Sequence, residues 1–132
     1  MIFKLSNENI LNLTTANQNP QVKVVGVEPA SSPLLTEGRA GSHGLQGIGA
    51  NFVPDALDVS VMDQILTMTE AEAYEYGKAM ARKEGVLVGI TSGAALAAAV
   101  KLAKQPENEG KTIVVLMPDT GERYLSSPMF AE

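Results

Sequence analysis

The chain has 132 residues, 45% of them hydrophobic, and a formal net charge of −5. This length suits one domain with a buried core, and the hydrophobic fraction excludes a disordered chain. Because the 10 Lys and Arg residues are scattered along an acidic chain, we expect neither nucleic acid nor a membrane surface as a partner. With no Cys and one His, disulfides are excluded and a metal site is not expected. No apolar run approaches the length of a membrane span, and together these features favour a cytoplasmic protein.

The alternation of apolar runs predicts an α/β fold with a partial, mostly parallel sheet and flanking helices. The elements expected in chain order are a strand over 22–27, a short helix over 34–39, a glycine-rich loop over 41–49, an edge strand within 59–68, a helix over 70–84, a strand over 86–90, a helix over 94–103 and a strand over 111–117. We expect the strands over 22–27, 86–90 and 112–117 to form one parallel sheet.

The helix over 70–84 has clear signals at both ends. Thr69 and Glu72 have the spacing of a capping box, in which each side chain bonds the backbone N–H of the other residue. Gly85 follows the last turn, and glycine readily adopts the left-handed conformation that ends a helix. The sequence therefore predicts where this helix begins and where it ends.

The first residues differ in character from the rest. Residues 1–17 are rich in Asn and Thr, and they show no long helical pattern. We therefore divide the chain into a divergent N-terminal segment, 1–18, and an α/β portion, 19–132.

A tight turn joins the strand predicted over 86–90 to the alanine-rich helix over 94–103. Thr91 and Ser92 lie in this turn, at a helix N-terminus where backbone N–H groups lack partners and the helix dipole is positive. A hydroxyl there either caps the helix or turns outward toward a ligand. From the residues alone the cap is favoured, since Ser and Thr are ordinary N-cap residues.

Four stretches carry a resemblance to a known family: VVGVEP at 24–29, HGLQGIGANFVP at 43–54, VLVGITSGAA at 86–95 and PDTGERYLS at 118–126. In matching order, they closely resemble the C-terminal part of cysteine synthase, also called O-acetylserine sulfhydrylase. The resemblance runs from about residue 19 to residue 132. It implies the C-terminal portion of a fold type II enzyme of the pyridoxal-phosphate-dependent β-family, with pyridoxal 5′-phosphate as cofactor.

The resemblance also implies roles for individual residues. Thr91 takes the position of the hydroxyl that faces the pyridine nitrogen, which leaves Ser92 as the expected helix cap. Gly47 lies in the loop beside the cofactor, and Pro118 and Asp119 border the pyridine end of the pocket. Residues 122–124 are expected to make structural pairs. The lone His43 is interpreted as a surface hydrogen-bonding group rather than a general base.

Other parts of the family pattern have no counterpart in this sequence. No lysine has the neighbours of the family's imine lysine, and neither the substrate-carboxylate loop nor the phosphate loop with its strand is found. Hence no catalytic residue is assigned, and the chain is expected to be inactive in isolation. The parent reaction replaces the acetate of O-acetylserine, a small amino-acid substrate, with sulfide to give cysteine.

Two alternative hypotheses for the function remain open. The chain could be a non-catalytic protein-binding remnant, because the resemblance implies a homodimer and a pocket edge that accepts serine acetyltransferase. Within the enzyme class, the alternative is a fragment similar to cystathionine β-synthase or to serine sulfhydrylase.

Overall fold

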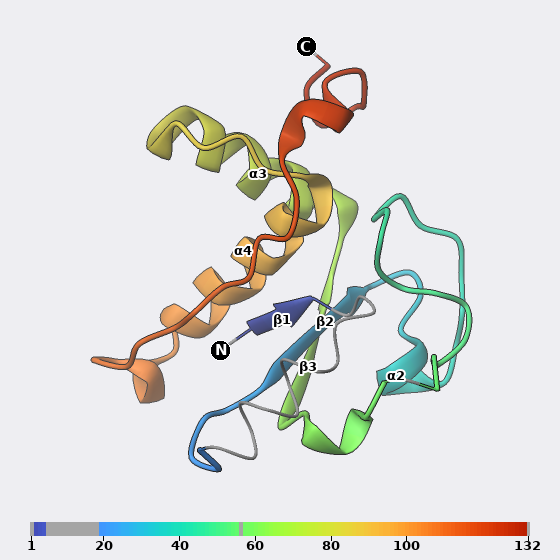
Figure 1. The fold of residues 1–132 in the computed structure, drawn as a ribbon, viewed down its shortest axis with the longest axis vertical. Helices are drawn as coiled ribbons and strands as arrows, with labels where there is room; N and C mark the ends of the chain where they lie inside the picture. The colour runs from blue at the N-terminus through green and yellow to red at the C-terminus, as the bar shows by residue number, and fades with distance from the viewer. Residues whose placement is uncertain (1, 5–18, 56, 132) are drawn as a thin grey trace.

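The computed structural model describes residues 2–4, 19–55 and 57–131. Three short strands form a parallel sheet in the order β1 (Ile2–Lys4), β2 (Val25–Pro29) and β3 (Gln64–Met68) (Figure 1). Ile2 is paired with Val25, and Val25 in turn with Gln64. All five residues of the central strand β2 are buried, as expected of a strand covered on both faces.

The helix α4 (Ile90–Ala103) contacts all three strands and forms the centre of the core. Ten of its 14 residues are buried, so this helix has no solvent-facing side over most of its length. Small alanine side chains let neighbouring elements approach it closely. Larger apolar residues fill the surrounding space, among them Val27, Leu45, Met68 and Met129.

The helix α3 (Glu70–Glu84) has the predicted bounds, and both of its end signals are confirmed. Thr69 and Glu72 form a reciprocal capping box, and Gly85 ends the helix at φ 70°. The helix packs against α4 at two glycines, Gly77 and Gly93. A Cβ atom added to Gly93 would lie 2.1 Å from the carbonyl oxygen of Ala73, so the two helix backbones are in close contact.

The remaining elements are short. They are the helix α2 (Leu34–Glu37) and the 3₁₀ turns η1 (Val59–Val61), η2 (Pro106–Asn108) and η3 (Gly121–Tyr124). The predicted short helix ends at Glu37 because Gly38 there adopts the left-handed conformation. The strand predicted over 22–27 is shifted toward Pro29, and the expected edge strand is confined to β3.

Among the described residues, two predicted strands are not part of the named sheet, so the prediction of one sheet built from 22–27, 86–90 and 112–117 was wrong for the described sheet. Within 86–90 only Val88 has strand pairing, an isolated antiparallel bridge to Thr120. Residues 111–117 form no named strand in the described part of the chain, although Val115 is a bridge residue. A strand needs a neighbour for its backbone groups, so apolar composition alone did not decide these two segments.

The described sheet is completed instead by β1, which the sequence analysis did not predict. It lies inside the segment 1–18 that we had separated from the rest, and it pairs with the central strand. Residues 5–18 of that segment lie outside the described residues. The division at residue 18 therefore stays a prediction.

Candidate functional site

Thr91 lies in the first turn of α4, which begins four residues earlier than predicted. The helix N-cap is Gly89, in an extended conformation and without a side-chain cap. Thr91 is 2% exposed, and its Oγ1 is buried with no hydrogen-bond partner in the described part of the chain. A buried hydroxyl without a partner is costly, so this oxygen is available to a ligand atom.

Ser92 is fully buried beside Thr91, but it does not cap the helix. Its Oγ donates a hydrogen bond of 2.8 Å to Oδ1 of Asp119. The predicted cap role was wrong because the helix already begins at Ile90, so Ser92 is inside the first turn. The structure thus gives the two neighbouring hydroxyls different environments, one paired and one unpaired.

Asp119 holds the N-terminal end of α4 through side chain and backbone. The phenol of Tyr124 donates to Oδ2 of Asp119 at 2.7 Å, and the backbone N–H of Gly89 donates to its carbonyl oxygen at 3.2 Å. The hydrogen bond to this carboxylate raises the pKa of the Tyr124 phenol, and burial raises it further. Tyr124 therefore has the structural role expected of residues 122–124. Sequence reasoning had not paired it with Asp119.

Two glycines, Gly89 and Gly121, allow the start of α4 and the segment around Asp119 to lie in close contact. A Cβ atom at Gly89 would lie 2.3 Å from Oδ1 of Asp119, and one at Gly121 would lie 2.8 Å from the carbonyl oxygen of Val88. Neither position has room for a larger residue. Pro118 precedes this contact and is exposed, so it lies at the surface beside the helix end.

The glycine-rich loop at 41–49 forms a second group of predicted site residues. Gly47 is exposed and has φ 96°, a conformation that favours glycine. Nε2 of His43 donates to the carbonyl oxygen of Gly49 at 2.8 Å, while its Nδ1 is buried with no partner among the described residues. His43 is thus half-buried and closes the loop, which corrects the surface position expected for it.

Hydrogen bonds at both ends fix this loop to the rest of the fold. The backbone N–H of Gly41 donates to Oγ of Ser32 at 3.0 Å, and that of Gly44 donates to Oε1 of Glu70 in the first turn of α3. No hydrogen bond among the described residues links Gly47 to Thr91 or Asp119. Thr91 and Asp119 thus lie at one end of α4, and Gly47 lies in a loop that hydrogen bonds fix to Ser32 and to α3.

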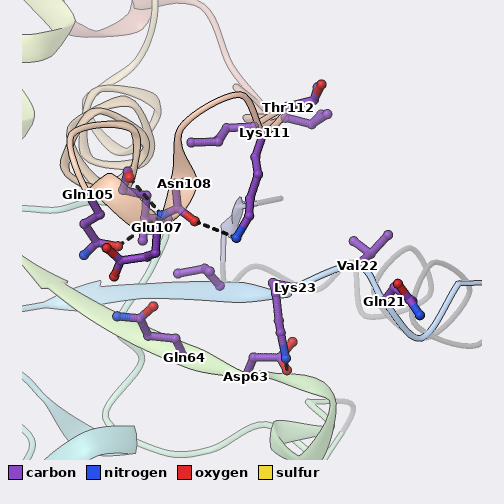
Figure 2. Close-up of a pocket in the computed structure, with 14 residues that line it drawn as sticks. Gln21, Val22, Lys23, Asp63, Gln64, Gln105, Glu107, Asn108, Lys111 and Thr112 are labelled. Atoms are coloured by element: carbon purple, nitrogen blue, oxygen red, sulfur yellow. Dashed lines mark hydrogen bonds and ion pairs between the residues drawn. The ribbon is translucent and has the colours of Figure 1, made fainter.

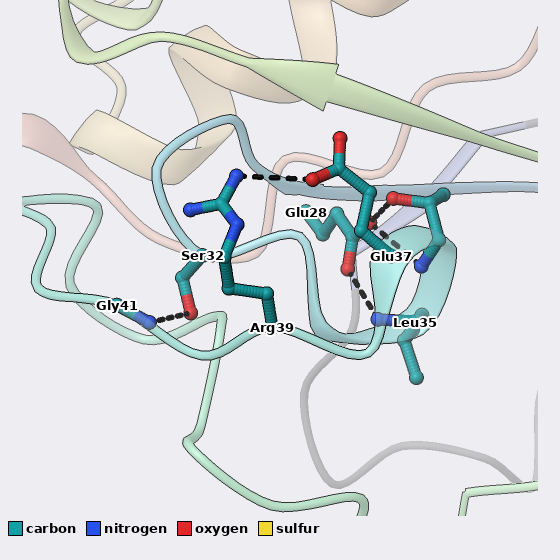
Figure 3. Close-up of polar contacts among 7 residues, drawn as sticks. Glu28, Ser32, Leu35, Glu37, Arg39 and Gly41 are labelled. Atoms are coloured by element: carbon teal, nitrogen blue, oxygen red, sulfur yellow. Dashed lines mark hydrogen bonds and ion pairs between the residues drawn. The ribbon is translucent and has the colours of Figure 1, made fainter.

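Glu28 supports the same loop from the end of β2. Its carboxylate is 2% exposed and accepts from the backbone N–H groups of Leu35, at 2.9 Å, and Thr36, at 3.1 Å, as well as from the Thr36 hydroxyl (Figure 3). These donors lie at the start of α2, where helical N–H groups lack partners. The buried carboxylate is therefore a structural group that holds the helix leading into the loop.

Residues 11–119 match the sequence model of a family described as pyridoxal-phosphate dependent enzyme. The chain belongs to this family. Among the described residues, no helix is long and apolar enough to cross a membrane. No group of three or more His, Asp or Glu side chains there could hold a metal ion.

Individual members of the pyridoxal-phosphate-dependent family give a narrower likeness. Cysteine synthase of Staphylococcus aureus is 43% identical over 112 residues, which cover 85% of this chain and 36% of that relative. The crystal structure of O-acetylserine sulfhydrylase isoform 3 from Entamoeba histolytica superimposes with a TM-score of 0.92 and 39% identity, covering 98% of this chain and 40% of that one. An O-acetylserine-dependent cystathionine β-synthase from Helicobacter pylori gives a TM-score of 0.80 and 35% identity, covering 93% and 40%.

These likenesses confirm the family and the fold expected from the sequence, namely part of a fold type II pyridoxal-phosphate enzyme. The chain spans 36% of the length of the curated cysteine synthase it matches. It therefore corresponds to one portion of such an enzyme.

Proposed function

We propose that the chain is the cofactor-facing C-terminal portion of a cysteine synthase, and that the Thr91 hydroxyl donates a hydrogen bond to the pyridine nitrogen of pyridoxal phosphate. The observation that carries this proposal is the buried Oγ1 of Thr91, which has no hydrogen-bond partner among the described residues. An aromatic nitrogen acceptor would satisfy it. By the same resemblance Pro118 and Asp119 border the pyridine end of the pocket, and Gly47 lets the loop backbone approach the ring.

The parent reaction replaces acetate with sulfide at the β-carbon of O-acetylserine. When bound, pyridoxal phosphate supplies the electron sink for this chemistry. A hydroxyl such as that of Thr91 does not hold a proton on the ring nitrogen as a carboxylate would. This favours β-elimination over reactions that need a stronger electron sink. Asp119 has a positioning role, because its hydrogen bonds with Ser92 and Tyr124 fix the helix turn that carries Thr91.

The proposed activity needs a complementary polypeptide. No lysine here has the neighbours of the family's imine lysine, so the isolated chain is expected to be inactive. We place the assembled enzyme in the cytoplasm, as a homodimer able to bind serine acetyltransferase. If the chain had no complement, it would act only as a protein-binding remnant. A partner closer to cystathionine β-synthase would change the sulfur donor.

Co-expression with the N-terminal portion of the Staphylococcus aureus cysteine synthase tests the proposal. The measurements are pyridoxal phosphate retained after gel filtration and cysteine formed from O-acetylserine and sulfide. Thr91→Val leaves the ring nitrogen unpaired at a cost of about 1–3 kcal/mol, so we expect roughly 10-fold weaker retention. Thr91→Ser keeps the donor and serves as the control. Equal retention by the Val variant and the unsubstituted chain would refute the role of Thr91.

A further inference from the structure

The tip of the glycine-rich loop is a short turn held between two buried side chains. Leu45 is fully buried and Ile48 is 7% exposed, and both belong to the core cluster. Gln46 and Gly47 between them are exposed. The backbone N–H of Ile48 donates to the carbonyl oxygen of Leu45 at 3.4 Å, which closes the turn. The fold therefore presents Gly47 at the surface, while the side chains on either side of the tip are buried in the core.

The peptide groups of Gly44 link this turn to α3. The carbonyl oxygen of Gly44 accepts from the backbone N–H of Gln46 at 2.9 Å, and its own N–H donates to Oε1 of Glu70. The contact is close, because a Cβ atom added to Gly44 would lie 2.7 Å from Oε2 of Glu70. A continuous set of contacts therefore runs from Glu70 through Gly44 to Gln46, which is the neighbour of Gly47.

The position of Glu70 is fixed independently of the loop. Glu70 is the first residue of α3, and the capping box of Thr69 and Glu72 fixes the helical turn from which its side chain extends. Nζ of Lys101 on α4 lies 2.6 Å from Oε1 of Glu72, so the same turn is also joined to α4. A hydrogen bond to an ionised acceptor is about twice as strong as one between neutral groups. The carboxylate of Glu70 is thus a firm attachment point for the loop.

We propose that Glu70 is a positioning residue for Gly47, because it holds the Gly44 amide and so orients the turn over 45–48. Burial of Leu45 and Ile48 is a non-directional contact, whereas the hydrogen bond at Gly44 has a defined geometry and orients the peptides that follow. That the turn faces the cofactor rests on the proposed function. The hold of Glu70 on the turn does not.

Two substitutions of Glu70 separate the reach of its side chain from its charge. Glu70→Asp keeps the negative charge that favours a helix N-terminus, but its side chain is shorter by one methylene group. Glu70→Gln loses the charge and keeps a carbonyl oxygen at the same position. If Glu70 acts by holding Gly44, Glu70→Asp should release this amide and Glu70→Gln should not. Glu75→Asp, at an exposed position of the same helix, is the matched control and should change nothing.

Residue-resolved amide hydrogen exchange of the full chain is the readout. In Glu70→Asp the amides of Gly44 and Gln46 should exchange about 10-fold faster, because a hydrogen bond to a charged acceptor is lost. The amide of Val24 is the internal reference, since it also donates to a carboxylate, that of Asp63, at 2.8 Å. Figure 2 shows Asp63 at a separate groove of about 730 Å³, and no described residue of the loop over 41–49 lines that groove. The exchange rate of Val24 should be the same in all variants.

Cofactor retention after co-expression connects the loop to the proposed function. Glu70→Asp should lower the pyridoxal phosphate retained by the complemented protein, whereas Glu70→Gln should retain as much as the unsubstituted chain. Faster exchange of the two loop amides with unchanged retention would uphold the hold of Glu70 and refute the cofactor role of Gly47. No retention by the unsubstituted complemented protein would refute the proposed function, and the exchange rates would still decide the role of Glu70.

Three results would overturn the proposal. Unchanged exchange of the two loop amides in Glu70→Asp would show that burial of the apolar side chains is sufficient to hold the turn. Equal acceleration in Glu70→Gln and Glu70→Asp would show that Glu70 acts through its charge at the helix end. An equal rise in the exchange rate of Val24 would show a general loss of stability.

Discussion

The Ser92 hydroxyl donates to the carboxylate of Asp119, a residue 27 positions later in the chain. Both groups are at least partly buried, and Asp119 also accepts from Tyr124 and, through its carbonyl oxygen, from Gly89. One aspartate therefore joins the first turn of α4 to the segment that follows residue 117. The position of Thr91 depends on this junction, because Thr91 is the neighbour of Ser92 in the same turn.

Ser92→Ala should lower the free energy of unfolding by about 1–3 kcal/mol, because it removes a buried hydrogen bond to a charged acceptor. Urea unfolding of the isolated chain measures this loss. Ser60→Ala is the control, since Ser60 also bonds an aspartate, Asp58, but is exposed. A loss no larger than that of the control would show that the buried bond contributes little.

Thr91→Val should raise the unfolding free energy of the isolated chain by about 1 kcal/mol. It nearly keeps the shape of the side chain and removes a buried hydroxyl that has no partner among the described residues. The same substitution should weaken cofactor retention in the complemented protein. The substitution would then raise the unfolding free energy of the isolated chain, measured by urea unfolding, and lower the cofactor retention of the complemented protein. Thr91→Ser keeps the hydroxyl, so it should change neither the unfolding free energy nor the cofactor retention in this way. Destabilisation of the isolated chain by Thr91→Val would mean that the hydroxyl already has a partner.

Glu72 should make the stability of the chain fall in acid. The hydrogen bond from Lys101 on α4, followed by those from Thr69, lowers the pKa of Glu72 from 4.5 to about 2. A lowered folded pKa gives stability that is present above pH 4.5 and is lost as the pH falls toward 2.

Urea unfolding at several pH values tests this contribution. Glu72→Gln should flatten the dependence between pH 4.5 and about 2. Added salt should reduce the contribution of the unsubstituted chain, because Lys101 is exposed. Glu75→Gln, on an exposed position of the same helix, should keep the original slope. If the unfolding free energy of Glu72→Gln and that of Glu75→Gln depended on pH with the same slope, the role of Glu72 would be contradicted.

Gly93→Ala should cost about 3 kcal/mol or more, because its Cβ would collide with the backbone of Ala73 and Gly77 on α3. Gly77→Ala should cost less. Its new Cβ meets the terminal methyl of Met129, which is a flexible side chain, and alanine favours the helix. Thermal unfolding of both variants gives the comparison. A larger loss at Gly77 would mean that the buried Met129 cannot move.

The sequence predicted those features that depend on neighbours in the chain. The helix α3 was predicted at both ends because Thr69, Glu72 and Gly85 carry its signals locally. The strands predicted over 86–90 and 111–117 failed because a strand depends on what lies beside it. Val88 is paired with a single residue far along the chain, and β1 takes the place next to the central strand.

In the candidate site, too, local features were predicted from the sequence and contacts between distant residues were not. The turn with Thr91 and Ser92 was located from residue types, but which hydroxyl is paired depends on Asp119, and no local pattern shows that contact. The role of Tyr124 was missed in detail for the same reason. The closing contact of His43 depends on the loop returning through Gly49 at φ 67°.

The bridge between Val88 and Thr120 has a consequence for solvent exchange. The amide of Gly89 donates to Asp119 and the amide of Gly121 donates to Leu87, both at 3.2 Å, on either side of this bridge. Because the two bonds join the same two segments, one opening event exposes both amides to water. Their deuterium uptake should therefore follow a common rate, set by separation of the two segments and not by fraying of α4.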